Sequence, residues 1–142
     1  MAARVLIITD RLALSPGLTD AVRARVEQGP ATFRLLVTNP ARAEFHLVHA
    51  ERHRAVEQSQ EALQQALGEL SLLTGSPVAG EVSIRHDAFE AAEEDLLQRP
   101  ADEVLVAVHE HELAHRLHHD LKHRLEHLHV AVTVVPDGLL AP

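Results

Sequence analysis

The segment from His109 to His129 holds the residues most capable of chemistry, with eight histidines and three glutamates in 21 positions. Within it, His111-Glu112-Leu113-Ala114-His115 matches the His-Glu-x-x-His pattern, in which two histidines one helical turn apart hold zinc and the glutamate is a general base. A composition this biased produces such a match by chance in roughly one case in three. No long second helix follows to supply a third ligand, so we interpret the match as coincidental.

The same histidines could form a weaker metal site. On a helix over about Glu110–Leu128, the leucines make one stripe, and most histidines lie away from it. Pairs four residues apart, taken from His111, His115, His119 and His123, could chelate zinc, nickel or copper, although two ligands do not complete a site. Two other interpretations stay open. The histidines can be a solvated face of biased composition, or they can sense pH, since protonating all twelve changes the formal net charge from −8 to +4.

The elements that must position these residues alternate between strand and helix, which predicts βαβ units, a parallel sheet and helices on both of its faces. The pattern predicts a half-exposed edge strand around Val82–Ile84. We expect one α/β domain over residues 1–142 with a short tail at 137–142. The other expected strands are Arg4–Thr9, Phe33–Thr38, Glu103–Val108 and Val130–Val135. The first expected helix starts at Ser15-Pro16, and the other three cover Glu51–Leu73, Asp87–Gln98 and Glu110–Leu128.

Parallel sheets bind ligands beyond the carboxyl ends of their strands, where the strand order reverses. The expected strands end at Thr9-Asp10, at Thr38-Asn39 and just before His109. We therefore take Asp10, Thr38 and His109 as candidate cofactor-binding residues. Asp10 has an alternative role, because an aspartate after a strand often hydrogen-bonds the backbone of the loop that follows.

Composition excludes several classes of function. A net charge of −8 and only three aromatic residues, all phenylalanine, argue against a nucleic-acid partner. Without cysteine there are no disulfides and no thiolate zinc sites. No apolar run approaches the ~20 residues that span a bilayer, and the apolar run at the N-terminus is too short for a signal peptide. We expect a cytoplasmic protein with no membrane partner.

From Arg4 to Val135 the chain resembles the universal stress protein family. The resemblance rests on a first strand that ends in Asp10 (VLIITD), on ADEVLVAV at 101–108, on VAVTVV at 130–135 and on the long second helix. It implies a doubly wound sheet of order 3-2-1-4-5. It also implies dimers, often paired through the last strand, and in many members ATP in the cleft at the reversal point.

The chain departs from the ATP-binding members at specific places. Those members carry Gly-x2-Gly-x9-Gly-Ser/Thr after the fourth strand, so that backbone N–H groups can approach the phosphates. This chain has no glycine between Gly80 and Gly138. His86-Asp87 stands in place of the usual Gly-Asp, and Ala131 in place of a proline. Only Asp10 matches a nucleotide contact of the family, on the adenosine side, so we predict no cofactor and no ATP bound through a phosphate loop.

The uncharged strand Val130–Val135 predicts a homodimer, because an exposed apolar edge without charges is normally paired or covered. The expected function is a non-enzymatic, universal-stress-protein-like binding and dimerisation module with a stress-related or regulatory role. One alternative is a member that binds ATP or AMP by other contacts, and a second is a protein that binds metal through residues 109–129. A metal hydrolase or a nucleotide-dependent transferase are the enzyme alternatives.

Overall fold

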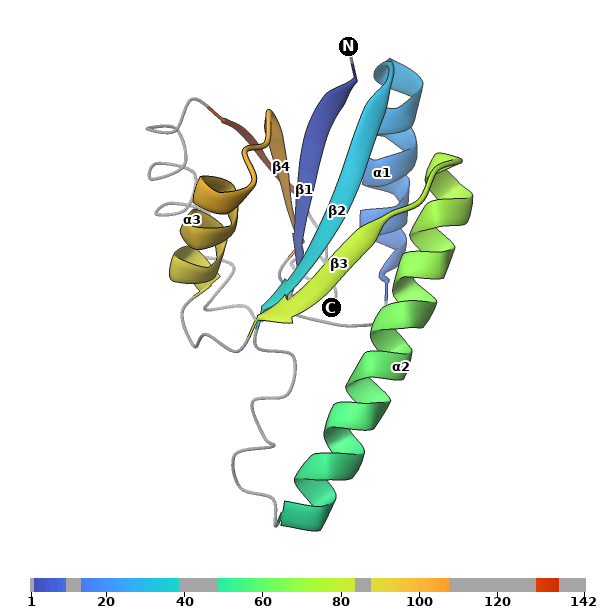
Figure 1. Cartoon of the computed structure of the whole chain (residues 1–142). Coiled ribbons are helices and arrows are strands. Elements are labelled where there is room, and N and C mark those ends of the chain that lie inside the picture. The colour runs from blue at the N-terminus through green and yellow to red at the C-terminus, as the bar shows by residue number, and fades with distance from the viewer. Residues whose placement is uncertain (1, 10–13, 39–48, 84–87, 108–129, 136–142) are drawn as a thin grey trace, which may run out of the picture.

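The computed structural model describes residues 2–9, 14–38, 49–83, 88–107 and 130–135 (Figure 1). Within them, five strands form one parallel sheet in the order β3-β2-β1-β4-β5. This confirms the α/β class and the doubly wound strand order expected above. The elements are β1 (Ala3–Thr9), α1 (Pro16–Gln28), β2 (Ala31–Thr38), α2 (His49–Thr74), β3 (Ala79–Ser83), α3 (Ala88–Gln98), β4 (Glu103–Ala107) and β5 (Ala131–Val134).

Strand β1 is the centre of the sheet, between β2 and β4. Its residues from Val5 to Thr9 are all buried, as a continuous apolar run predicts for a strand covered on both faces. Because successive side chains point to opposite faces, Leu6 and Ile8 enter one core cluster while Val5 and Ile7 enter the other.

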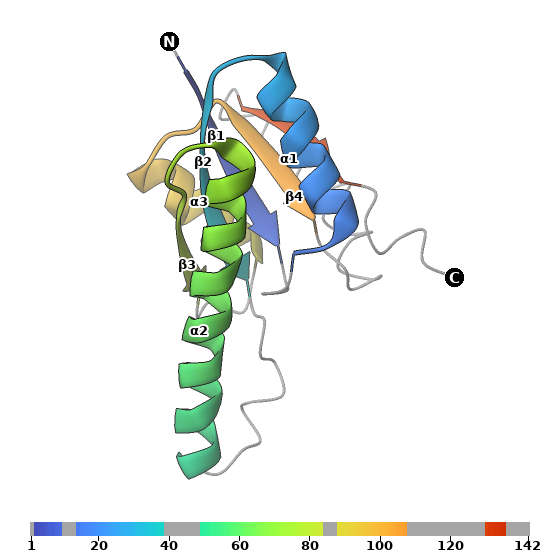
Figure 2. The same ribbon diagram turned by 90° about the vertical axis from the view of Figure 1, so that its right-hand side faces the viewer.

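Helices α1 and α2 cover one face of the sheet, and α3 lies on the opposite face (Figure 2). Helix α1 begins as the sequence predicts. The Ser15 hydroxyl oxygen accepts a hydrogen bond from the Leu18 N–H at 3.3 Å, and Pro16 is the first helical residue. The buried residues described on α2 lie in its second half, and Figure 1 shows the first half extending beyond the sheet. These residues are Leu63, Ala66, Leu67 and Leu70.

The core on the other face is built from small and aliphatic side chains. Ala91, Ala92 and Leu96 of α3 share one cluster with Leu6 and with other residues of β1, β2 and β4. Their spacing along α3 explains why the helix lies flat against the sheet. Helix α2 is long but strongly polar, and no helix in the described ranges combines the length and apolar character of a membrane span.

The two outer strands differ in composition. Among the described residues, strand β3 pairs with β2 alone, which confirms the expected edge, and Gly80 allows α2 to approach it closely. A Cβ added at Gly80 would lie 2.7 Å from Leu67 Cδ2 and 3.0 Å from the Leu35 carbonyl oxygen. Strand β5 pairs with β4 and is the other outer strand of the sheet in the part of the chain that the structure describes.

The boundaries differ slightly from those predicted. Strand β2 begins at Ala31, two residues before Phe33, because Ala31 already pairs with Ala3 of β1. Strand β5 is shorter than Val130–Val135, although both of those valines are buried. Helix α2 begins two residues before Glu51. Val108 and the helix expected over Glu110–Leu128 lie outside the described residues.

An ion pair joins the end of α1 to the start of β4. Arg25 donates from Nη2 to Glu103 Oε2 at 2.7 Å and from Nε to both carboxylate oxygens at 2.9 and 3.0 Å. The hydrogen bonds from Arg25 to Glu103 raise the arginine pKa above its ordinary value, because they stabilise the charged guanidinium more than burial destabilises it. The pair fixes where α1 ends relative to the sheet.

Candidate functional site

The carboxyl ends of four strands lie next to one another at the same end of the sheet. Thr9 of β1 pairs with Val37 of β2 and with Ala107 of β4, and Thr38 pairs with Ser83 of β3. The sequence predicts a ligand cleft at this end of the sheet. The register confirms that the strand ends lie side by side.

Thr38 is the candidate residue that the structure describes. It is 1 % exposed, and its hydroxyl donates to the Thr9 carbonyl oxygen at 3.4 Å. Thr9 is equally buried. The Thr38 hydroxyl therefore joins two neighbouring strand ends, and because its one O–H is used in this bond, it could serve a ligand only as an acceptor while the bond is kept.

The other candidate residues lie outside the described ranges. They are Asp10 and His109 at the cleft, and His111, His115, His119 and His123 of the metal hypothesis. Among the residues that the structure does describe, no group of three or more His, Asp or Glu side chains could hold a metal ion.

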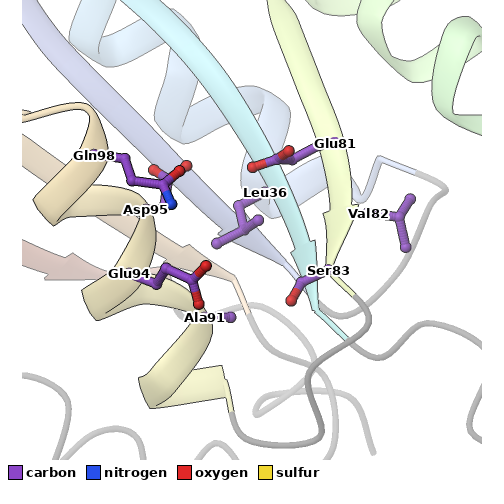
Figure 3. Close-up of a pocket in the computed structure, with 8 residues that line it drawn as sticks. All are labelled: Leu36, Glu81, Val82, Ser83, Ala91, Glu94, Asp95 and Gln98. Atoms are coloured by element: carbon purple, nitrogen blue, oxygen red, sulfur yellow. The ribbon is translucent and has the colours of Figure 1, made fainter.

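A groove of about 480 Å³ opens between α3 and the carboxyl halves of β2 and β3 (Figure 3). Its volume lies within the range of ligand pockets, roughly 300–1,000 Å³. Leu36 of β2 and Ala91 of α3 are its apolar lining residues nearest the core. Its polar lining comes from two elements, with Glu81 and Ser83 on β3 and Glu94, Asp95 and Gln98 on α3.

An arginine on β2 neutralises one of these carboxylates. Arg34 donates from Nε and Nη2 to Asp95 Oδ2 at 3.0 and 2.6 Å, and Nη2 also donates to the Arg99 carbonyl oxygen. The two side chains are only 16 % and 7 % exposed. Burying a charge is costly unless it is paired and hydrogen-bonded, and this geometry provides both. The ion pair also anchors the last turn of α3 to the sheet.

The groove carries two further acidic residues. Glu81 and Glu94 are carboxylates on opposite walls, and among the described lining residues there is no histidine, lysine or arginine. A phosphate group would find no cationic partner among the described residues of this lining.

Sequence reasoning missed this groove, although two signals pointed to it. Arg34 interrupts the apolar run FRLLVT, and Asp95 stands in α3 between the buried Ala92 and Leu96. A charged residue at a core position of a strand, and one of opposite sign at a core position of a helix, indicate a buried ion pair.

The comparisons with known proteins add no family. Neither a scan against protein-family models nor a search of the curated proteins finds a match for this chain. The resemblance to universal stress proteins therefore stays a prediction, and the strand order agrees with what that resemblance implies.

Proposed function

We propose that this chain is a non-enzymatic, universal-stress-protein-like domain that acts as a binding and dimerisation module and does not hold ATP through a phosphate loop. The sheet order 3-2-1-4-5 supports the resemblance. The glycine-free stretch after β4 supports the loss of the phosphate loop, because side chains with a Cβ keep the backbone away from a triphosphate.

The observation that carries the proposal is the edge formed by β5. Its N–H groups alternate in direction: Ala131 donates to the Asp102 carbonyl and Val135 to the Val106 carbonyl, both on the β4 side. By this alternation, the N–H groups of Val132 and Val134 point away from β4. The strand reads AVTV and has no charged residue, and Thr133 is exposed.

The opposite edge strand, β3, carries a charge that β5 lacks. Strand β3 carries the exposed Glu81, and a charge on an edge strand discourages pairing with a second chain. Of the two edges, β5 is therefore the better surface for a second copy, and we assign the homodimer to it.

The first test is the oligomeric state of wild type and of two lysine variants, measured by sedimentation. Thr133→Lys places a charge on the proposed interface and should produce a folded monomer. Ala79→Lys is the matched control, because Ala79 is exposed on the β3 edge. It should remain a dimer. A wild-type monomer at high concentration, or equal dissociation of both variants, would contradict the assignment. Val132 is a poorer site for the lysine, because it packs against the core cluster of α3.

A second test is calorimetry with ATP and AMP on the wild-type chain. The proposal expects no binding at micromolar nucleotide. Micromolar affinity that is lost on changing residues 109–112 would instead favour the nucleotide-binding alternative.

A further inference from the structure

A second cavity, of about 310 Å³, lies beside the amino-terminal halves of β1 and β2 and the residues after α3. Arg4 of β1, Arg34 of β2 and Arg99 after α3 all line it, together with Thr32. Arg4 and Thr32 are register partners on adjacent strands. Side-chain alternation places Arg4 and Arg34 on the α3 face of the sheet, the same face as Leu6 and Leu36. Three segments that are distant in the sequence thus bring three arginines to one cavity.

Carboxylates hold two of these arginines in place. Arg4 donates from Nε to Asp102 Oδ2 and from Nη2 to Oδ1, both at 3.3 Å. Arg34 donates to Asp95 and to the Arg99 carbonyl oxygen. Each guanidinium has five N–H donors, and these bonds use only Nε and Nη2. Both arginines are therefore oriented by their partners, and within the described residues their Nη1 donors make no hydrogen bond that would compete with a ligand.

Arg99 differs from the other two. It is exposed, and within the described part of the chain its guanidinium makes no hydrogen bond or ion pair. Its backbone is fixed, because its N–H donates to the Asp95 carbonyl at 2.8 Å and its own carbonyl accepts from Arg34. Three arginine charges against the carboxylates of Asp95 and Asp102 leave one net positive charge at this cavity, in a chain whose net charge is −8.

We propose that this cavity binds a tetrahedral oxyanion of the phosphate class, either inorganic phosphate or the phosphate group of a small monoester. Arginine forms charge-assisted hydrogen bonds with phosphate oxygens. A carboxylate presents two oxygens in one plane, whereas a tetrahedral anion presents its oxygens in several directions and can accept from guanidinium groups on three segments at once. The site is at the end of the sheet opposite to Thr9 and Thr38, so it is independent of the function proposed above.

The test is a titration of the full chain with inorganic phosphate, with ionic strength held constant by sodium chloride. Binding to the native state should give a saturable rise in Tm, and calorimetry should give a matching Kd. A parallel titration with acetate should give a Kd at least fivefold weaker. A monoester such as glycerol phosphate separates the two sources. Tighter binding of the ester than of phosphate would favour a phosphorylated small molecule, and weaker binding would favour the free ion.

The decisive variant is Arg99→Gln, because the Arg99 side chain holds no other described residue. It should weaken phosphate binding at least fivefold and leave the Tm without phosphate unchanged. Arg23→Gln is the matched control. Arg23 is an exposed arginine on α1 whose nearest carboxylate, that of Asp20, is 3.9 Å away. It should bind phosphate as the wild type does. If Arg99→Gln lowers the Tm in the absence of phosphate, Arg99→Lys is used as a second variant. It should fold correctly and weaken phosphate binding less than Arg99→Gln does.

Three results would overturn the proposal. One is a Tm that rises no more with phosphate than with chloride at the same ionic strength. Another is acetate binding as tightly as phosphate. The third is an equal loss of phosphate binding in Arg99→Gln and Arg23→Gln, since that would reflect the overall charge of the chain and not this cavity.

Discussion

At the scale of single residues, Asp95 and Asp102 both bind arginines, but in different surroundings. The Asp95 side chain is 7 % exposed and lies between α3 and β2, whereas that of Asp102, just before β4, is about half exposed. Asp102 also accepts a hydrogen bond from the Arg4 backbone N–H at 2.8 Å. Removing the partner of Asp95 therefore leaves a buried carboxylate without a counter-ion. The contribution of the Asp102 ion pair to stability can instead be tested by protonating Asp102.

The first prediction concerns the acid side of the stability curve. Hydrogen bonds from the Arg4 side chain, and then from its backbone N–H, lower the pKa of Asp102 below its ordinary value of 3.8. Because the folded form holds the charged carboxylate more strongly, this stabilisation is full above pH 3.8 and is lost as the pH falls through the lowered pKa. Urea unfolding should find Asp102→Asn less stable than wild type at pH 7, with a difference that shrinks below pH 3.8.

The control for this prediction is Asp20→Asn, which removes an exposed carboxylate whose contact with Arg23 is 3.9 Å long. Exposed pairs of this kind contribute about 0–1 kcal/mol, so its stability should stay close to that of wild type at every pH. An Asp102→Asn difference that persists unchanged down to pH 2.5 would show that the charge of Asp102 is not what stabilises the fold.

The second prediction concerns the buried pair. Arg34→Met leaves the Asp95 carboxylate without its partner and should lower the free energy of unfolding by about 3 kcal/mol. Arg34→Met with Asp95→Leu replaces both charges with apolar side chains and should come within about 1 kcal/mol of wild type. Urea denaturation of the two single variants and the double variant gives the coupling energy directly. A double variant as unstable as the sum of the single ones would contradict this account.

At the scale of elements, the sequence predicted those features that depend on residues close together in the chain. The start of α1 could be predicted because Ser15 and Pro16 act within a single helical turn. The edge position of β3 could be predicted from its alternating pattern. The groove and the arginine cavity could not, because each depends on contacts between residues far apart in the sequence, such as the Arg34–Asp95 bond, whose partners are 61 positions apart. Nothing in a linear pattern states which helix turn meets which strand residue.

The third prediction compares two glycines. An alanine at Gly80 would place its Cβ 2.7 Å from Leu67 Cδ2 and 3.0 Å from a backbone oxygen of β2. Gly80→Ala should therefore cost about 2 kcal/mol through overpacking. Gly68 lies in α2 with nothing within 4 Å of an added Cβ, so Gly68→Ala should stabilise the protein by about 0.5–1 kcal/mol. Thermal unfolding should separate the two in opposite directions, and a neutral Gly80→Ala would mean that α2 can move away from β3 at little cost.

At the scale of the whole molecule, the sheet divides the chain into regions of different chemistry. Acidic side chains line the groove between α3 and β3, and arginines line the cavity at the amino-terminal half of the sheet. The uncharged edge β5 is on the far side of β4 from both. The proposed dimer strand shares no residue with the lining of the groove or of the anion cavity, whereas those two sites are linked, because Asp95 of the groove binds Arg34 of the cavity.

The fourth prediction concerns the twelve histidines, eight of which fall within residues 109–129. Imidazoles titrate near pH 6.5, so mild acid moves the formal net charge from −8 towards +4. On the helix that the sequence predicts there, histidines four residues apart repel each other once charged, and stability should fall between about pH 7 and 5. Replacing His111, His115, His119 and His123 with Gln should preserve the fold at neutral pH and flatten this dependence of stability on pH.

The test compares melting curves of wild type and variant between about pH 7 and 5, recorded in chelator so that no metal contributes. Parallel curves would show that these histidines do not couple acid to stability, and peptidase activity restored by zinc would show that the His-Glu-x-x-His match is a catalytic site after all.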